Sequence, residues 1–210
     1  GTSGTKTLLI DTAGRKVASA TVEYPLHTPH PLWAEQNPAD WWAATARGIQ
    51  HVLAESKVAP AEIAGIGLSG QMHGSVFLDA EHQVIRPAIL WCDQRTAEQT
   101  LWITNRAGQH VVEEETLNQV LPGFTAPKIV WLQQKEPAAW ARVKKILLPK
   151  DYIRFMLTGE FATEVSDASG TSLLNVRKRQ WSAPMMEACS VTAEMLPKVY
   201  ESQEISGRVS

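Results

Sequence analysis

The sequence predicts an α/β fold from three observations. Short apolar runs of strand length alternate along the chain with longer segments whose apolar residues recur at helical spacing. Glycine, proline and small polar residues separate these segments. Apolar residues make up 44% of the 210 positions, so the chain can bury a sizeable core.

The N-terminal part of the chain predicts a hairpin followed by a long helix. Residues 6–10 and 16–24 have the composition of strands, and a turn at 11–14 joins them. Asn37 then provides an N-cap, and Pro38 is the first position of a helix that continues to about residue 56.

The middle of the chain predicts two strands on either side of a polar loop. Residues 63–68 and 75–78 are apolar enough for strands, and the segment 69–74 (Ser-Gly-Gln-Met-His-Gly) interrupts them. A further buried strand is expected at 86–91, followed by a helix at 96–106.

The second half of the chain continues the alternation. The expected elements are a helix capped by Thr125 and running through 132, a strand at 145–148, a helix at 152–157 closed by Gly159, a polar turn at 166–171, a strand at 172–175, a helix from 181 to 189 and the start of a strand at 204–210. Lys128 lies in the first turn of its helix, where the helix dipole disfavours a cation, so we expect it to have a partner such as a carboxylate or an anion.

Composition and charge exclude several classes of function. The formal net charge of −2 gives no electrostatic basis for binding nucleic acid or an anionic membrane. No apolar run reaches the roughly 18 residues of a membrane span, and no signal segment opens the sequence. Cys92 and Cys189 are too few for a disulfide framework or a zinc site, and no metal site is predicted. These features fit a reducing cytoplasm.

The segment 69–74 is the strongest candidate for a binding site. Its two glycines permit backbone angles that other residues avoid, and they let a ligand approach the main chain. Between them, Gln71, Met72 and His73 offer an amide, a thioether and an imidazole to one small molecule. The local pattern is equally compatible with a turn between strands whose histidine is satisfied by its neighbours.

Asp93 and Arg95 form a second candidate, because they follow the strand expected at 86–91. In open α/β sheets, ligands bind outside the carboxyl ends of the strands. The alternative is that Asp93 caps the following helix and that Arg95 is solvated.

Several segments together resemble the FGGY family of carbohydrate kinases. Residues 1–6 (Gly-Thr-Ser-Gly-Thr-Lys) are similar to the second half of the family's first-strand phosphate loop, and 69–74 is similar to the sugar-contact segment of the branch that phosphorylates xylulose. Further matches, in the order of the family, are 91–95, 123–131, 148–152 and 166–171. The resemblance covers essentially all of residues 1–210.

The resemblance implies an actin-like ATPase fold, also called ribonuclease H-like, in which helices flank a mixed central sheet. It implies one domain of a two-domain sugar kinase that transfers the γ-phosphate of MgATP to the C5 hydroxyl of D-xylulose, a step of pentose catabolism. Such chemistry needs positioning, charge neutralisation by Mg²⁺ and a base for the hydroxyl proton. By the resemblance, the sugar-binding residues are Gln71, Met72, His73 and Asp93, and the residues facing the ATP phosphates are Thr2 and Ser3.

The sequence departs from the family pattern at both ends. The family's first-strand aspartate would precede Gly1, and its catalytic base, an aspartate in a Gly-Gly-Asp-Asn-type segment, would lie beyond Ser210. Asp93, Asp151 and Asp167 do not occur in that context, so no base is assigned within the chain. The chain is therefore expected to be the N-terminal, sugar-binding domain, without the nucleotide-binding domain and without useful turnover alone.

Two alternatives stay open at this point. One is a sibling kinase that acts on glycerol, gluconate or another ketose, and the other is a non-catalytic sugar-binding module of the same fold. The expected setting is cytoplasmic, with a small sugar as substrate, neither nucleic acid nor membrane as partner, and a homodimer as one possible assembly of the full-length protein. The assignment depends on residues 71–73 facing a crevice wide enough for a five-carbon ketose.

Overall fold

The computed structural model describes residues 1–209. Its helices, in chain order, are α1 (Pro38–Ser56), η1 (Pro60–Glu62), α2 (Ala97–Ala107), α3 (Gln109–Thr116), α4 (Thr125–Lys135), α5 (Pro137–Trp140), α6 (Pro149–Thr158), α7 (Val165–Ser169), α8 (Ala183–Ala188) and η2 (Ala193–Met195). Its strands are β1 (Gly4–Ile10), β2 (Lys16–Glu23), β3 (Glu35–Gln36), β4 (Val76–Leu78), β5 (Ala88–Ile89), β6 (Lys145–Leu147), β7 (Ala162–Glu164), β8 (Leu174–Asn175), β9 (Gln180–Trp181) and β10 (Lys198–Tyr200). The α/β fold class predicted from the sequence is confirmed.

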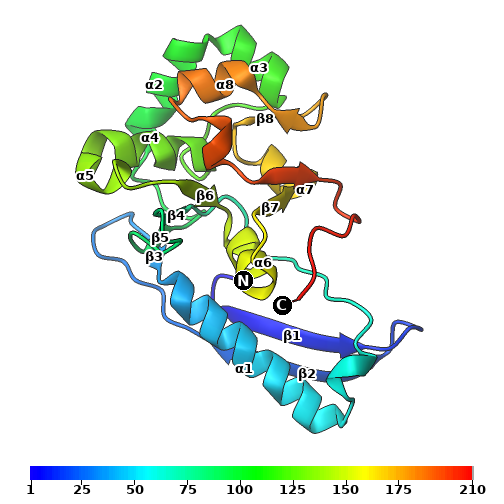
Figure 1. The fold of residues 1–210 in the computed structure, drawn as a ribbon. Coiled ribbons are helices and arrows are strands. Elements are labelled where there is room, and N and C mark those ends of the chain that lie inside the picture. Colours follow the sequence, from blue (N-terminus) through cyan, green and yellow to red (C-terminus); the bar gives the residue numbers. More distant parts are fainter. Residues whose placement is uncertain (210) are drawn as a thin grey trace.

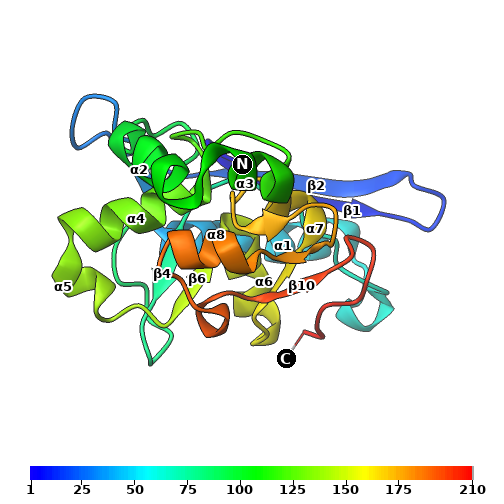
Figure 2. The ribbon, with the colours of Figure 1, turned by 90° about the horizontal axis from the view of Figure 1, so that it is seen from above.

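The elements lie in three tiers. The hairpin β1–β2 and the helix α1 lie together at one end, and α2, α3 and α8 gather at the opposite end (Figure 1). Between them lie β4, β5 and β6 with α4 and α6. Seen from above, the hairpin projects sideways beyond the helices (Figure 2).

The N-terminal part confirms the predictions made for it. In the hairpin turn, Gly14 donates its N–H to the carbonyl of Asp11 at 2.9 Å and adopts a φ of 79°. The side chain of Asn37 accepts from the N–H of Ala39 at 3.1 Å and so caps α1. A Cβ at Gly48 would lie 2.2 Å from Oγ1 of Thr7, so only glycine lets α1 lie this close to β1.

The strands form five two-stranded ladders. Four of them are antiparallel (β1–β2, β3–β5, β4–β6 and β8–β9), and β7–β10 is parallel, so both kinds of pairing occur in the described residues, in separate ladders. A bridge between Ser75 and Ile89 joins the β3–β5 and β4–β6 ladders in the middle tier.

The middle-tier strands separate two clusters of buried apolar residues. Phe77 and Ile146 belong to the cluster beneath α2, α3, α4 and α8, whereas Val76, Leu78 and Leu147 belong to the cluster that includes residues of α1 and α6. Successive side chains of a strand point to opposite faces, so three-residue strands supply both clusters. The loops that follow these strands are thereby fixed to a packed core.

Some predicted elements are not formed. Residues 63–68 were predicted as a strand but lie outside any strand, because no strand in the described chain pairs with them; residues 64–70 are mostly exposed. The expected polar turn at 166–171 instead begins with α7, whose first N–H groups at Ser166 and Asp167 are accepted by the carboxylate of Glu164. The strand expected from 204 is absent over 204–209, and Ser210 lies outside the described residues.

A helix needs about 20 predominantly apolar residues to cross a bilayer. No helix in residues 1–209 is both long enough and apolar enough to do so.

Candidate functional site

The segment 69–74 forms a surface loop that lies on the start of α6. A Cβ at Gly70 would lie 3.0 Å from Cβ of Lys150, and one at Gly74 would lie 2.7 Å from Cγ of Pro149. A side chain at Gly74 would therefore displace Pro149, and one at Gly70 would press on Lys150, so both glycines suit close packing of the loop on α6. The sequence had suggested that these glycines let a ligand approach the main chain. The packing on α6 gives a structural reason for them instead.

His73 is held in one orientation by its neighbours. Its ring stacks on Phe124 with centroids 4.4 Å apart, and Nδ1 lies 2.8 Å from the carbonyl oxygen of Gly170. A carbonyl only accepts, so Nδ1 carries the proton and Nε2 is left as a hydrogen-bond acceptor. Partial burial, and the nearby Lys128 ammonium, lower the pKa of His73, although the Gly170 contact raises it. The imidazole is consequently neutral near pH 7.

Two residues of α4 hold the backbone of His73. Its φ of 64° is in the left-handed region, which is uncommon for a residue other than glycine. Its carbonyl accepts from Oγ1 of Thr125 and from Nζ of Lys128, both at 3.1 Å. The hydroxyl of Thr125 therefore fixes the loop. The sequence-based prediction that Thr125 caps α4 is wrong, because Thr125 is the first residue of the helix and its hydroxyl bonds the loop.

The partner of Lys128 is a group of carbonyls. Besides His73, Nζ contacts the carbonyl oxygens of Gly123 and Phe124, and the side chain is completely buried. The prediction of a partner is confirmed, but the expected carboxylate or anion is replaced by backbone oxygens. Burial lowers the pKa of Lys128 to about 7 against the attraction of the nearby Asp93.

Gln71 and Met72 differ in their exposure. Met72 is 47% exposed and presents its thioether at the surface, whereas Gln71 is only 7% exposed. Nε2 of Gln71 donates to Oε1 of Gln36 at 3.0 Å, so its amide is turned into the protein. The sequence-based expectation that Gln71 contacts the ligand directly is not met in this arrangement.

A cleft of about 540 Å³ lies elsewhere on the described chain. It is lined by Leu26 and residues 28–34 together with Cys92 and Gln94, and residues 71–73 are not among its walls. The crevice that the sequence reasoning expected around these three residues is therefore not this cleft. The 69–74 loop is open to solvent on the side of Met72.

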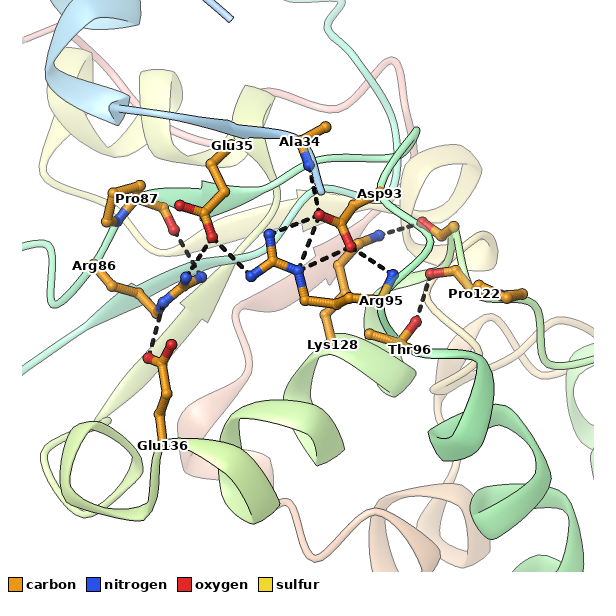
Figure 3. A network of polar contacts seen from close by, with 11 residues as sticks. Ala34, Glu35, Arg86, Pro87, Asp93, Arg95, Thr96, Pro122, Lys128 and Glu136 are labelled. Carbon is orange, nitrogen blue, oxygen red and sulfur yellow. Dashed lines mark hydrogen bonds and ion pairs between the residues drawn. The ribbon is translucent and has the colours of Figure 1, made fainter. Parts of the chain in front are cut away.

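Asp93 supports the site from inside the protein (Figure 3). It is completely buried; Oδ2 accepts from the N–H of Ala34 at 2.7 Å, and both oxygens accept from the guanidinium of Arg95. Nη1 of Arg95 lies 2.7 Å from Glu35, and the guanidinium stacks 3.6 Å above the ring of Trp33. Asp93 therefore has no surface to offer a sugar, and of the roles weighed from the sequence only the structural one fits.

Thr2 is tied to the middle tier by two donors. Its Oγ1 accepts from Nε1 of Trp91 at 2.9 Å, and its carbonyl accepts from Nε2 of Gln36 at 2.7 Å. Ser3 is exposed. The two hydroxyls expected to face phosphates thus lie at the bend of residues 1–3 before β1, referred to below as the turn, and Gln36 holds its backbone through the carbonyl of Thr2.

Neither of the remaining aspartates considered from the sequence is free. Asp151 is completely buried, and its Oδ1 lies 2.6 Å from Nη1 of Arg154. Asp167 lies 3.2 Å from Nζ of Lys150, and burial raises its pKa to about 6. Both belong to an ion-pair cluster beneath the 69–74 loop, in which each carboxylate has a cationic partner.

Three residues of the site were missed by sequence reasoning. Gln36, Phe124 and Gly170 each contact the candidate loop or turn, but they come from β3, from the residue before α4 and from the residue after α7. Within residues 123–128, the sequence had predicted a helix cap at Thr125 and a partner for Lys128, but not the contact of Phe124 with His73. No local pattern indicated these contacts, because they form only when the tiers pack.

Comparison with known proteins identifies the family. The model of the N-terminal domain of the FGGY family of carbohydrate kinases matches residues 1–210. This chain belongs to the FGGY family. Among curated FGGY proteins, it is 45% identical to the xylulose kinase of Escherichia coli K12 over 99% of this chain, and 41% identical to the xylulose kinase of Bacillus subtilis 168 over 99%.

Solved structures of FGGY kinases confirm the actin-like fold. A structure described as a xyloylose kinase from Brucella ovis superposes with a TM-score of 0.95 at 42% identity, and a gluconate kinase from Lactobacillus acidophilus superposes with a TM-score of 0.91 at 27% identity. Each match covers all of this chain, and it covers 43% of the Brucella ovis chain and 42% of the Lactobacillus acidophilus chain. The chain likewise spans 42% of the E. coli relative's length. Kinases named for different sugars share this fold, so the fold alone does not select the sugar.

Proposed function

We propose that this chain is the sugar-binding part of a xylulose kinase, which transfers the γ-phosphate of MgATP to the C5 hydroxyl of D-xylulose. The observation that carries the proposal is the orientation of His73. Because Nδ1 donates to Gly170, Nε2 is an acceptor ready for a sugar hydroxyl, and no group of residues 1–209 occupies it. The exposed thioether of Met72 beside it supplies an apolar surface for the C–H groups of a sugar.

The resemblance to xylulose kinases supports the choice of sugar. The curated relatives at 45% and 41% identity carry that name, and the match extends through the whole chain, including the 69–74 loop. Gluconate remains the second candidate because a kinase of that name shares the fold closely.

The nucleotide is assigned in less detail. The Thr2 and Ser3 hydroxyls are suited to phosphate oxygens, and when ATP is bound they would hold and orient the phosphates. Mg²⁺ would supply charge neutralisation to the phosphates. Residues 1–209 contain no group of three or more histidine, cysteine or acidic side chains that could hold a metal, so no residue of this chain is assigned to it. We expect the base outside this chain, as the sequence suggested.

The test is a panel of sugars assayed with MgATP and the complete gene product. D-xylulose is expected to give the highest kcat/KM among xylulose, gluconate, glycerol and other ketoses. His73→Ala removes the acceptor and is expected to lower kcat/KM for the preferred sugar by about 10- to 100-fold, the range for a lost hydrogen bond to a buried partner.

A matched control is available in His82. It is also a histidine with a left-handed backbone, at φ 60°, and it packs against Phe155 and Phe161 away from the loop. His82→Ala is expected to leave the sugar kinetics unchanged. A higher kcat/KM for gluconate than for xylulose would overturn the choice of sugar. Equal losses of kcat/KM in His73→Ala and His82→Ala would show that His73 does not bind the sugar.

A further inference from the structure

Gln36 lies between the two parts of the molecule assigned to the two substrates. It is completely buried in β3, where the antiparallel pairing with Ala88 fixes its backbone. Nε2 donates to the carbonyl of Thr2 at 2.7 Å and to that of Pro25 at 3.2 Å. Oε1 accepts from Nε1 of Trp41 and from Nε2 of Gln71, both at 3.0 Å.

The orientation of this amide is fixed by chemistry. An indole N–H only donates and a carbonyl only accepts, so Trp41 must face the oxygen of Gln36 and Thr2 must face its nitrogen. A primary amide has two donor hydrogens and two acceptor lone pairs, and here all four are used. The amide of Gln71 is consequently forced to present its nitrogen to Gln36, which leaves Oε1 of Gln71 buried without a partner among residues 1–209.

We propose that Gln36 is a positioning residue that couples the turn at Thr2 to the loop at 69–74, so that the orientation of one depends on the other. The inference rests on the proposed function, in which the turn faces the phosphates and the loop faces the sugar. Gln36 is the one side chain of the described residues that hydrogen-bonds both segments. Any rotation of its amide that follows Thr2 also moves the acceptor oxygen, Oε1, offered to Nε2 of Gln71.

The alternative is that Gln36 only provides hydrogen-bond partners for two buried carbonyls and an indole, without coupling the two segments. In that case, cutting its bonds on one side would disturb that side alone. Coupling makes the opposite prediction. Removing the hydrogen bonds of Gln36 to one segment should also lower the order of the other segment. Two substitutions make these separate cuts.

Gln36→Glu keeps oxygen acceptors for Trp41 and Gln71 but removes the donors to Thr2 and Pro25. Gln71→Met removes only the bond to Gln36 and leaves the other three bonds of that amide in place. Gln99→Glu is the matched control, because Gln99 is also buried and its Nε2 donates to Gln134 between α2 and α4, away from both segments.

The experiment measures the order of two methyl groups by ¹³C NMR of the complete gene product: Met72 on the loop and Thr2 on the turn. We expect Gln36→Glu to lower the order parameter of the Met72 methyl, and Gln71→Met to lower that of the Thr2 methyl. Gln99→Glu should change neither. In kinetics, Gln36→Glu should raise the KM for the sugar by about tenfold, the effect of roughly one lost hydrogen bond, although its lost bonds lie on the turn.

The proposal is overturned if each cut loosens only its own end, or if Gln99→Glu loosens both. If Gln36→Glu does not fold, Gln71→Met decides alone, through the order of the Thr2 methyl. If the wild-type protein phosphorylates no sugar of the panel, the proposed function fails, and the NMR result still decides whether Gln36 couples the two segments.

Discussion

Lys128→Met tests whether a buried lysine changes its protonation on folding. The substitution replaces an ammonium with an apolar chain of similar length, in a site where the side chain is completely buried on α4. The folded pKa is about 7, below the ordinary lysine value of 10.5 that applies to the unfolded chain. Between these values the unfolded state holds a proton that the folded state has lost, so stability from this group rises with pH.

The magnitude follows from the width of that window. Each pH unit well inside it is worth about 1.4 kcal/mol, and the folded group is half protonated at pH 7, so from pH 7 to pH 9 the wild-type chain should gain roughly 2 kcal/mol relative to Lys128→Met. The variant also leaves three carbonyls without their donor, but that cost is the same at every pH and does not affect the slope.

The assay is urea unfolding of the 210-residue chain at several pH values between 6 and 10, with wild type and variant compared at each. Lys135→Met, on the same helix but with a side chain that is 51% exposed, is the control, and its curve should run parallel to that of wild type. If the curve of Lys128→Met is also parallel from pH 7 to pH 9, burial does not shift this lysine and the reasoning is wrong.

Three further predictions concern the loop, the buried ion pair and the first helix. Gly170→Ala would place a Cβ 2.3 Å from the ring of His73, so the sugar KM should rise at least about tenfold with little loss of thermal stability, measured by kinetics and a melting curve. Arg95→Met leaves Asp93 buried without its cation and should cost about 3–5 kcal/mol in urea unfolding; a loss below 1 kcal/mol would show that the pair is not desolvated. Asn37→Ala removes the N-cap of α1 and should cost about 1 kcal/mol in the same assay, whereas no change would mean that the cap is redundant.

Local chemistry explains which parts of the fold were predictable. The hairpin turn at Gly14 and the cap of α1 at Asn37 depend on neighbours within a few residues, and both are confirmed. The strand expected at 63–68 failed because a strand needs a partner, which the sequence of the segment cannot supply. The cap of α7 by Glu164 was missed because glutamate is not among the usual N-cap residues.

The candidate site could be located from the sequence, but its contacts could not be predicted. Residue type and the family resemblance both pointed to the glycine-flanked segment with Met72 and His73, and its role in binding sugar stays a prediction. The buried positions of Gln71 and Asp93 were not predictable, because they depend on Gln36 and Arg95, which reach them only through tertiary packing. Side-chain burial is decided by what packs on a residue from distant parts of the chain.

The 69–74 loop has few backbone hydrogen bonds of its own and is aligned from outside, by α4, by the start of α6, by Gly170 and by Gln36. Exchanging one of these supporting residues can therefore shift the loop while the sequence of 69–74 itself stays unchanged. Redesign of the loop has more positions to act on than its own six residues.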